Sequence, residues 1–170
     1  DRDGYQDFVL VGGNRPYVQL YRNKIGDLMP SDSTYQPIYI RLVGGNKTAS
    51  SSTEWTSRDG IGAKVVLKSG DLNISRELRC GEGLAAQNSS TMPIGIGDNK
   101  SASFVVKWPT GKITEVADAA PGQLITVYEN PADAASSNSF VVSSISKVAK
   151  GVAQEVLAAK IHDDAQTSQL

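Results

Sequence analysis

The chain has few of the residues that disulfides, zinc sites and membrane spans require. It contains one Cys and one His, which excludes an internal disulfide, and this pair cannot complete a zinc site alone. No apolar run approaches the roughly 20 residues that a membrane-spanning helix needs, so we expect no membrane span. Seventeen Lys and Arg side chains against 18 Asp and Glu leave a formal net charge of -1. Because this balance disfavours binding through bulk charge, we expect no nucleic-acid partner.

What is present is typical of one globular domain with extensions. Hydrophobic residues make up 39% of the 170 positions, and a chain of this length can bury roughly 70% of its unfolded surface. The sequence begins Asp-Arg-Asp-Gly, with no Met and no signal peptide. We therefore expect a piece of a longer protein, whose location must be inferred from resemblance rather than from a leader sequence.

Short apolar runs separated by turn residues dominate the first 130 residues, and this pattern is typical of a β-sandwich or barrel. In residues 103–108, Phe104 and Val106 alternate with Val105 and Lys107. The expected strands span residues 8–11, 18–21, 38–43, 63–68, 72–79, 92–96, 103–108, 112–116 and 123–129. Trp108 continues the Phe104 side of the alternation, so we expect it in the core.

The composition changes after residue 130. Residues 131–143 are rich in Ala, Ser and Asn, which indicates a linker. Apolar residues at spacings of 3 and 4 then predict an amphipathic helix over residues 144–162, followed by a polar tail at 163–170. The apolar residues that we expect to dock this helix are Ile145, Val148, Val152 and Val156. A single helix of this length is marginal alone, so its partner is the same domain, a sister domain or another chain.

Alternating carboxylates at the start of the chain have the pattern of a calcium loop. Calcium takes six to eight oxygen ligands, and Gly4 permits a sharp turn between them. The residues that fit are Asp1, Asp3, Tyr5 through its carbonyl, and Asp7. A solvated acidic turn is the alternative on spacing alone, and the apolar strand that begins at Phe8 favours Ca²⁺.

The same segment carries a recognisable repeat pattern. Asp-Arg-Asp-Gly-Tyr-Gln-Asp at 1–7 is followed by Phe-Val-Leu-Val at 8–11 and Leu-Tyr-Arg-Asn at 20–23. Residues 1–23 thus resemble an FG-GAP or VCBS repeat of integrin-type β-propellers. The resemblance implies a calcium-binding Asp loop and two strands of a propeller blade. Residues 24–36, which contain Pro30, Asp32 and Ser33, are expected to form a linker. A fraction of a blade cannot close a propeller, so we expect a partial blade.

A longer set of motifs covers residues 37–130. The motifs are Ser-Arg-Asp-Gly-Ile-Gly-Ala-Lys-Val at 57–65, Arg-Glu-Leu at 76–78, Gly-Glu-Gly at 81–83, Gln-Asn-Ser at 87–89, Ile-Gly-Ile-Gly at 94–97 and Val-Lys-Trp-Pro-Thr-Gly at 106–111. In this order they resemble the ASPIC/UnbV domain, which typically follows VCBS repeats in secreted proteins such as the cartilage acidic proteins. Met92-Pro93 departs from this pattern, because the family usually has a His-Phe pair there, and any role of that His is lost.

Three residues of one polar loop are candidates for a ligand or partner surface. Trp55 is a large aromatic residue in polar surroundings, while Arg58 and Asp59 either take part in recognition or pair with each other. Cys80 is expected to be a buried free thiol. The single His, at position 162, lies in the expected helix. No Ser, His and Asp residues form a plausible catalytic triad, so we expect no catalysis.

The sequence as a whole predicts a mainly β protein. We expect the end of a propeller-type blade, then an antiparallel β-sandwich or barrel-like domain, then one C-terminal α-helix. The predicted function is a non-catalytic binding or structural module, the C-terminal part of a larger calcium-binding VCBS/FG-GAP protein used for recognition or adhesion. Its loops at 46–59 and 84–91 are expected to present a surface to a protein or carbohydrate ligand. Its predicted location is extracellular, at the cell surface or in another extracytoplasmic compartment. The alternative is an accessory or self-assembling subunit, whose helix docks to neighbouring subunits of a complex.

Overall fold

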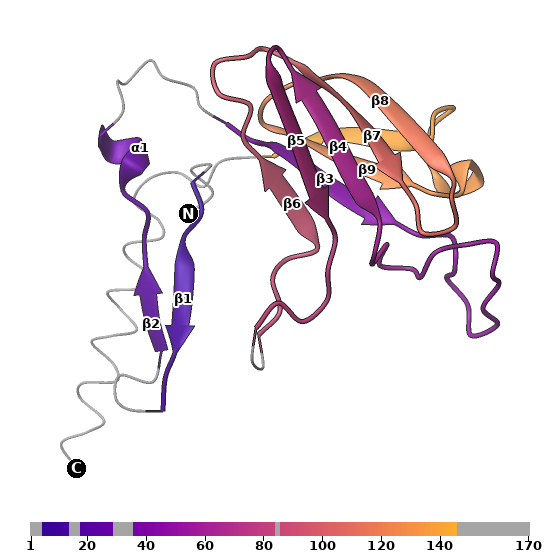
Figure 1. The fold of residues 1–170 in the computed structure, drawn as a ribbon, viewed down its shortest axis with the longest axis horizontal. Coiled ribbons are helices and arrows are strands. Elements are labelled where there is room, and N and C mark those ends of the chain that lie inside the picture. The colour runs from indigo at the N-terminus through magenta and orange to yellow at the C-terminus, as the bar shows by residue number, and fades with distance from the viewer. Residues whose placement is uncertain (1–4, 14–17, 29–35, 84–85, 146–170) are drawn as a thin grey trace. The chain divides into compact units, whose positions relative to one another are not determined.

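The computed structural model describes residues 5–13, 18–28, 36–83 and 86–145 (Figure 1). The chain divides into two compact units, one of which spans Tyr35–Ile145. In the part of the chain that the structure describes, no helix has the length and apolar character to span a membrane.

The first unit contains a two-stranded antiparallel hairpin of β1 (Phe8–Val11) and β2 (Val18–Tyr21), followed by the short helix α1 (Ile25–Leu28). Both strands have the predicted bounds. In the hairpin, Phe8 pairs with Tyr21 and their rings stack with centroids 4.5 Å apart. The apolar side chains of both strands are exposed, so within the described residues this hairpin lacks a covering layer on either face.

The second unit is a β-sandwich of two four-stranded sheets (Figure 1). One sheet has the strand order β10-β9-β3-β6 and the other has the order β5-β4-β7-β8. The strands are β3 (Ile38–Val43), β4 (Lys64–Ser69), β5 (Leu72–Glu77), β6 (Thr91–Ile94), β7 (Ala102–Lys107), β8 (Ile113–Ala119), β9 (Gln123–Tyr128) and β10 (Phe140–Ser144), and the 3-10 turn η1 (Pro131–Asp133) follows β9. The mainly β fold predicted from the sequence is confirmed.

The first sheet is mixed rather than purely antiparallel. Strands β3 and β9 run parallel, with Ile40 opposite Ile125, whereas the other strand pairs of the two described sheets are antiparallel. Parallel pairing requires a long connection between the two strands. Here all of β4 to β8 lies between them in the chain, and this connection contains the whole second sheet.

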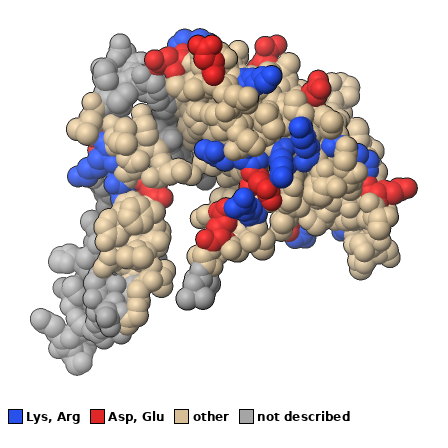
Figure 2. Space-filling model, viewed as in Figure 1, with Lys and Arg blue, Asp and Glu red and all other residues tan. Residues whose placement is uncertain are grey.

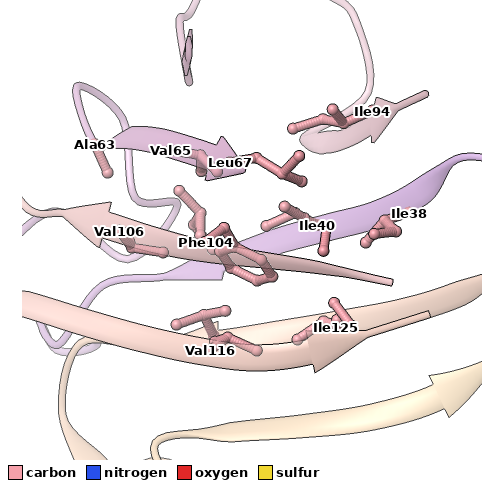
Figure 3. Packing of buried hydrophobic residues seen from close by; sticks show 14 of the residues in the cluster. Ile38, Ile40, Ala63, Val65, Leu67, Ile94, Phe104, Val106, Val116 and Ile125 are labelled. Carbon is pink, nitrogen blue, oxygen red and sulfur yellow. The ribbon is translucent and has the colours of Figure 1, made fainter. Parts of the chain in front are cut away.

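The core lies between the two sheets and is built from the inward-facing residues of each strand (Figure 3). Phe104, Val106 and Trp108 are all buried, as the alternation predicts. The Trp108 ring nitrogen donates to the Thr114 hydroxyl at 3.0 Å, which satisfies its single polar group. Burying side chains of this size stabilises the fold by about 1.5–3 kcal/mol each.

The chain after residue 130 differs from the predicted linker. Its β-branched residues Val141 and Val142 lie in β10, which pairs antiparallel with β9. Ser144, the first residue of the predicted helix, is the last residue of this strand. Ile145 lies just beyond it, and its N–H donates to the Gly122 carbonyl at 3.3 Å. The other predicted docking residues, Val148, Val152 and Val156, lie outside the described residues.

Candidate functional site

One end of the sandwich carries the long loop of residues 44–63, between β3 and β4. Strand β9 ends beside the start of this loop, and the Glu129 N–H donates to the Val43 carbonyl at 2.9 Å. The parallel pairing of β3 and β9 therefore sets the Glu129 side chain at the base of the loop.

The Glu129 carboxylate is buried and binds the loop from two sides. The residue is only 4% exposed. Its Oε2 accepts from the backbone N–H groups of Gly45 at 3.1 Å and Thr56 at 2.7 Å. Its Oε1 accepts from the hydroxyls of Thr56 at 2.9 Å and Thr110 at 2.6 Å. One carboxylate thus joins both arms of the loop to the turn between β7 and β8.

Two opposing effects act on the pKa of Glu129. Burial raises the pKa, because it removes water from the charged form. Hydrogen bonds from Thr110, Gly45 and Thr56 lower it, and their combined effect prevails, so the pKa lies below its ordinary value of 4.5. The carboxylate is therefore ionised at neutral pH, and each of its donors bonds to a negative charge.

Asn46 braces the loop from inside. Its side-chain amide donates to the Ser52 carbonyl at 2.8 Å, and its side-chain oxygen accepts from the Ser52 N–H at 2.8 Å. The same amide also donates to the Trp55 carbonyl. These bonds hold Asn46 against Ser52 and Trp55, so residues 46–55 form a closed loop. Residues 47–54, the tip of this loop, are exposed.

Trp55 lies in this braced loop and is half-buried. The backbone of Gly45 approaches its ring so closely that a Cβ at position 45 would lie 2.5 Å from the ring. The Lys112 ammonium lies 3.6 Å from the ring centroid, in cation–π geometry, and also donates to the Glu54 carbonyl. The Trp55 ring is therefore held by Gly45, which follows β3, and by Lys112, which precedes β8.

The other two predicted surface residues pair with each other. The Arg58 Nε lies 3.1 Å from Asp59 Oδ1, and both side chains are exposed. The hydrogen bond to Asp59 raises the pKa of Arg58 further above its already high value. Among the described residues, no hydrogen bond or ion pair joins Trp55 to this pair, so the three residues form two separate features.

Only part of the predicted calcium loop lies in the described structure. Tyr5 and Asp7 are described, whereas Asp1 and Asp3 lie outside the described residues. The Asp7 Oδ1 accepts from the Asn23 N–H at 2.8 Å, which ties the entry to β1 to the exit from β2. The Tyr5 carbonyl and the Asp7 carboxylate are oxygen ligands of the kind that Ca²⁺ prefers. Calcium binding by this segment stays a prediction.

Cys80 is exposed rather than buried. Strand β5 ends at Glu77, before the predicted end at residue 79, so Cys80 lies in the loop beyond the sheet and not over the core. Its thiol lies 3.6 Å from the Gln87 side-chain oxygen, which is not a base. Among the described residues, this amide oxygen is the side-chain contact of the Cys80 thiol.

Sequence reasoning missed the residue that organises this end of the molecule. The strand expected at 123–129 ends at Glu129, and the sequence pattern gives this residue no role of its own. An acidic residue at the end of an otherwise apolar strand is the local signal. Its partners Thr56 and Gly45 lie 73 and 84 residues away in the chain, so only the fold reveals them.

The fold and the braced loop define a β-sandwich domain with a fixed loop at one end. Residues 53–134 match the family model described as ASPIC and UnbV. This match begins inside the loop, ends just after η1, and includes Trp55, Thr56, Thr110 and Glu129. No curated protein and no solved structure matches the chain. The predicted ASPIC/UnbV domain is confirmed over these residues, and domains of this kind occur in extracellular-type proteins.

Proposed function

We propose that the chain is a non-catalytic recognition module of an extracytoplasmic protein, with the loop of residues 44–57 at the centre of its binding surface. The observation that carries the proposal is the buried Glu129 carboxylate, which holds both arms of this loop through four hydrogen bonds. A loop whose exposed tip stands on a fixed base is the arrangement that binding sites on rigid scaffolds use.

The energetic reason is preorganisation. Ordering a mobile loop on binding costs free energy that reduces affinity. In this loop, Asn46 and Glu129 have already ordered the backbone, and Lys112 holds the Trp55 ring. Exposed residues at 47–54 can then contact a partner with little further ordering.

The same contacts argue against an acid–base role for Glu129. A general acid or base needs a lone pair or a proton directed at a substrate. Both Glu129 oxygens accept bonds from Gly45, Thr56 and Thr110, and the low pKa keeps the group unprotonated at neutral pH. We therefore assign Glu129 to holding the loop.

We further propose that the first unit binds Ca²⁺ through Asp1, Asp3, the Tyr5 carbonyl and Asp7, as the terminal part of an FG-GAP/VCBS blade. The bond from Asn23 to Asp7 supports this, because it fixes one of the proposed ligands against the hairpin. Calcium would neutralise the repulsion among these carboxylates and stiffen the loop before β1.

A solid-phase binding screen tests the recognition function. The 170-residue chain is screened against immobilised dextran, dextran sulfate, polygalacturonate, gelatin and serum albumin, and then compared with Trp55→Ala and Asn46→Ala. Lys100→Gln, an exposed change away from the loop, is the control. We expect the loop variants to lose binding while the control keeps it. Equal binding by all four proteins would refute the loop as the recognition surface.

A second candidate, a subunit that assembles with other chains, is favoured by the hairpin of the first unit. Its apolar side chains are exposed on both faces, including Val9 at 58%, Leu10 at 50% and Val11 at 73%. Light scattering across a concentration series tests this candidate with Val9→Thr/Val11→Thr and, for the predicted helix, Val152→Asp. A monomer at all concentrations would remove the self-assembly form of this candidate.

A further inference from the structure

Two lysines stand directly opposite each other on the outer face of the second sheet. Lys64 of β4 pairs with Lys107 of β7. Both are exposed, whereas their chain neighbours Val65 and Val106 are buried, so the lysines point away from the core. Like charges in directly opposed cross-strand positions destabilise a sheet. A pair of opposite charges at these two positions would stabilise the sheet more than the Lys64–Lys107 pair does.

More charge lies beside this pair on the edge strand β5. Glu77 pairs with Lys64, and its Oε2 lies 3.8 Å from the Lys64 ammonium and 4.0 Å from the Arg79 guanidinium. The cluster of Lys64, Lys107, Arg79 and Glu77, here called the lysine cluster, has three cations and one carboxylate. Lys and Arg side chains gather in the middle of this face, with carboxylate atoms among them (Figure 2).

The lysine cluster lies at the loop end of the sandwich. Lys107 is the last residue of β7 and pairs with Ile113, the first residue of β8. The residue before Ile113 is Lys112, whose ammonium holds Trp55 and the Glu54 carbonyl. A ligand that extends over the end of β7 therefore passes from the lysine cluster to the braced loop.

We propose that the lysine cluster binds an acidic polysaccharide, a chain whose carboxylate or sulfate groups repeat at short intervals. This inference rests on the proposed recognition function and names the partner class. Charge complementarity requires an anionic ligand, and the cations stand on an open sheet face that suits an extended chain. A formal net charge of -1 disfavours a nucleic acid, because its charge density of about one negative charge per 1.7 Å of axis needs a broadly cationic partner. An acidic polysaccharide with more widely spaced charges needs only the few cations of the cluster within reach.

The test measures retention and dissociation constants of the full 170-residue chain on dextran sulfate and polygalacturonate, with neutral dextran as the uncharged matched probe. The double variant Lys64→Gln/Lys107→Gln is compared with Lys24→Gln/Lys100→Gln, which removes the same charge at other exposed sites. We expect the first to weaken binding by about tenfold and the second by less than about twofold. Which polymer binds more tightly assigns the anionic group as sulfate or carboxylate.

Glu77→Gln should change the affinity for the acidic polymers in the opposite direction. It removes the one carboxylate of the cluster, so we expect binding to tighten by about two- to fivefold, whereas Asp71→Asn at the far turn of the same hairpin leaves it unchanged. Thermal unfolding separates binding from folding. The lysine double variant should melt at about the same temperature as the wild type, because the repulsion that is removed offsets the loss of the exposed ion pair between Lys64 and Glu77.

The proposal would be overturned by no retention on either acidic polymer, by equal losses for the two double variants, or by no response to Glu77→Gln. Equal binding of dextran and dextran sulfate that only Trp55→Ala abolishes would also overturn it while leaving the recognition function intact. Conversely, binding that needs Lys64 and Lys107 but not Trp55 or Asn46 would retain the lysine cluster and refute the loop as the recognition surface.

Discussion

Glu129 and Thr56 are joined by two hydrogen bonds across 73 residues of sequence, one from the Thr56 N–H at 2.7 Å and one from its hydroxyl at 2.9 Å. The first satisfies a buried backbone donor, and the second satisfies a buried hydroxyl. Because hydrogen bonds to a charged group contribute about 1.5–3 kcal/mol each, this contact is a major link between the loop and the sandwich.

Glu129→Gln should destabilise the domain by about 1–3 kcal/mol. The amide group can replace only one of the two acceptor oxygens, so a donor from Gly45, Thr56 or Thr110 loses its partner. Urea unfolding followed by tryptophan fluorescence measures the change. Glu115→Gln, an exposed change on β8, is the control and should stay within about 0.5 kcal/mol of the wild type. Equal effects of the two variants would contradict the assigned role of Glu129.

The same carboxylate makes stability depend on pH. Its pKa is lower in the folded protein than its ordinary value of 4.5, so its contribution is complete above that value and is lost as the pH falls through the folded-state pKa. The difference in unfolding free energy between wild type and Glu129→Gln should therefore shrink between pH 6.5 and pH 3. A difference that stays constant or grows over this range would contradict the lowered pKa.

Gly44→Ala should destabilise the domain by about 2 kcal/mol or more. A Cβ at this position would overlap the Ser57 carbonyl oxygen and lie 2.6 Å from the Thr56 carbonyl oxygen, and backbone atoms held by Glu129 cannot move aside cheaply. Gly95→Ala is the matched control, since a Cβ there meets nothing within 4 Å. Thermal unfolding of both variants checks the prediction, which fails if Gly44→Ala melts like Gly95→Ala.

Lys107→Glu should raise the unfolding free energy by about 0.2–1 kcal/mol, because it replaces a like-charge pair with Lys64 by an opposite-charge pair. Urea unfolding at low salt measures the gain, and added salt should reduce it. Lys100→Glu, an exposed change before β7, should give no comparable gain. A loss of stability in Lys107→Glu would show that the two lysines do not repel each other.

Calcium should stabilise the first unit if Asp1, Asp3, Tyr5 and Asp7 bind it. Ligand linkage gives about 2.7 kcal/mol at a hundredfold excess over the dissociation constant. Asp3→Ala and Asp7→Asn should both abolish the response, measured by calorimetric titration and thermal unfolding. Asp7→Asn is the sharper variant, because an amide oxygen can still accept the Asn23 N–H. No heat and no shift in the wild-type chain would remove calcium from the proposed function.

The sequence by itself determined the strands whose signals are local. Residues 8–11, 18–21 and 38–43 have the predicted bounds, because apolar runs ending at Gly, Asn or Pro define strand limits without reference to the rest of the chain. The burial of Trp108 followed from alternation along β7 in the same way.

Only the tertiary structure decided the relationships between distant segments. The β10 strand forms because β9 offers an edge to Val141 and Val142, while the composition of its flanking residues resembles a linker. Cys80 is exposed because β5 ends early. Glu129 becomes the anchor of the loop because parallel pairing of β3 with β9 brings it to Gly45 and Thr56. Local patterns fix which residues turn inward, whereas the partners of a buried charge depend on which strands become neighbours.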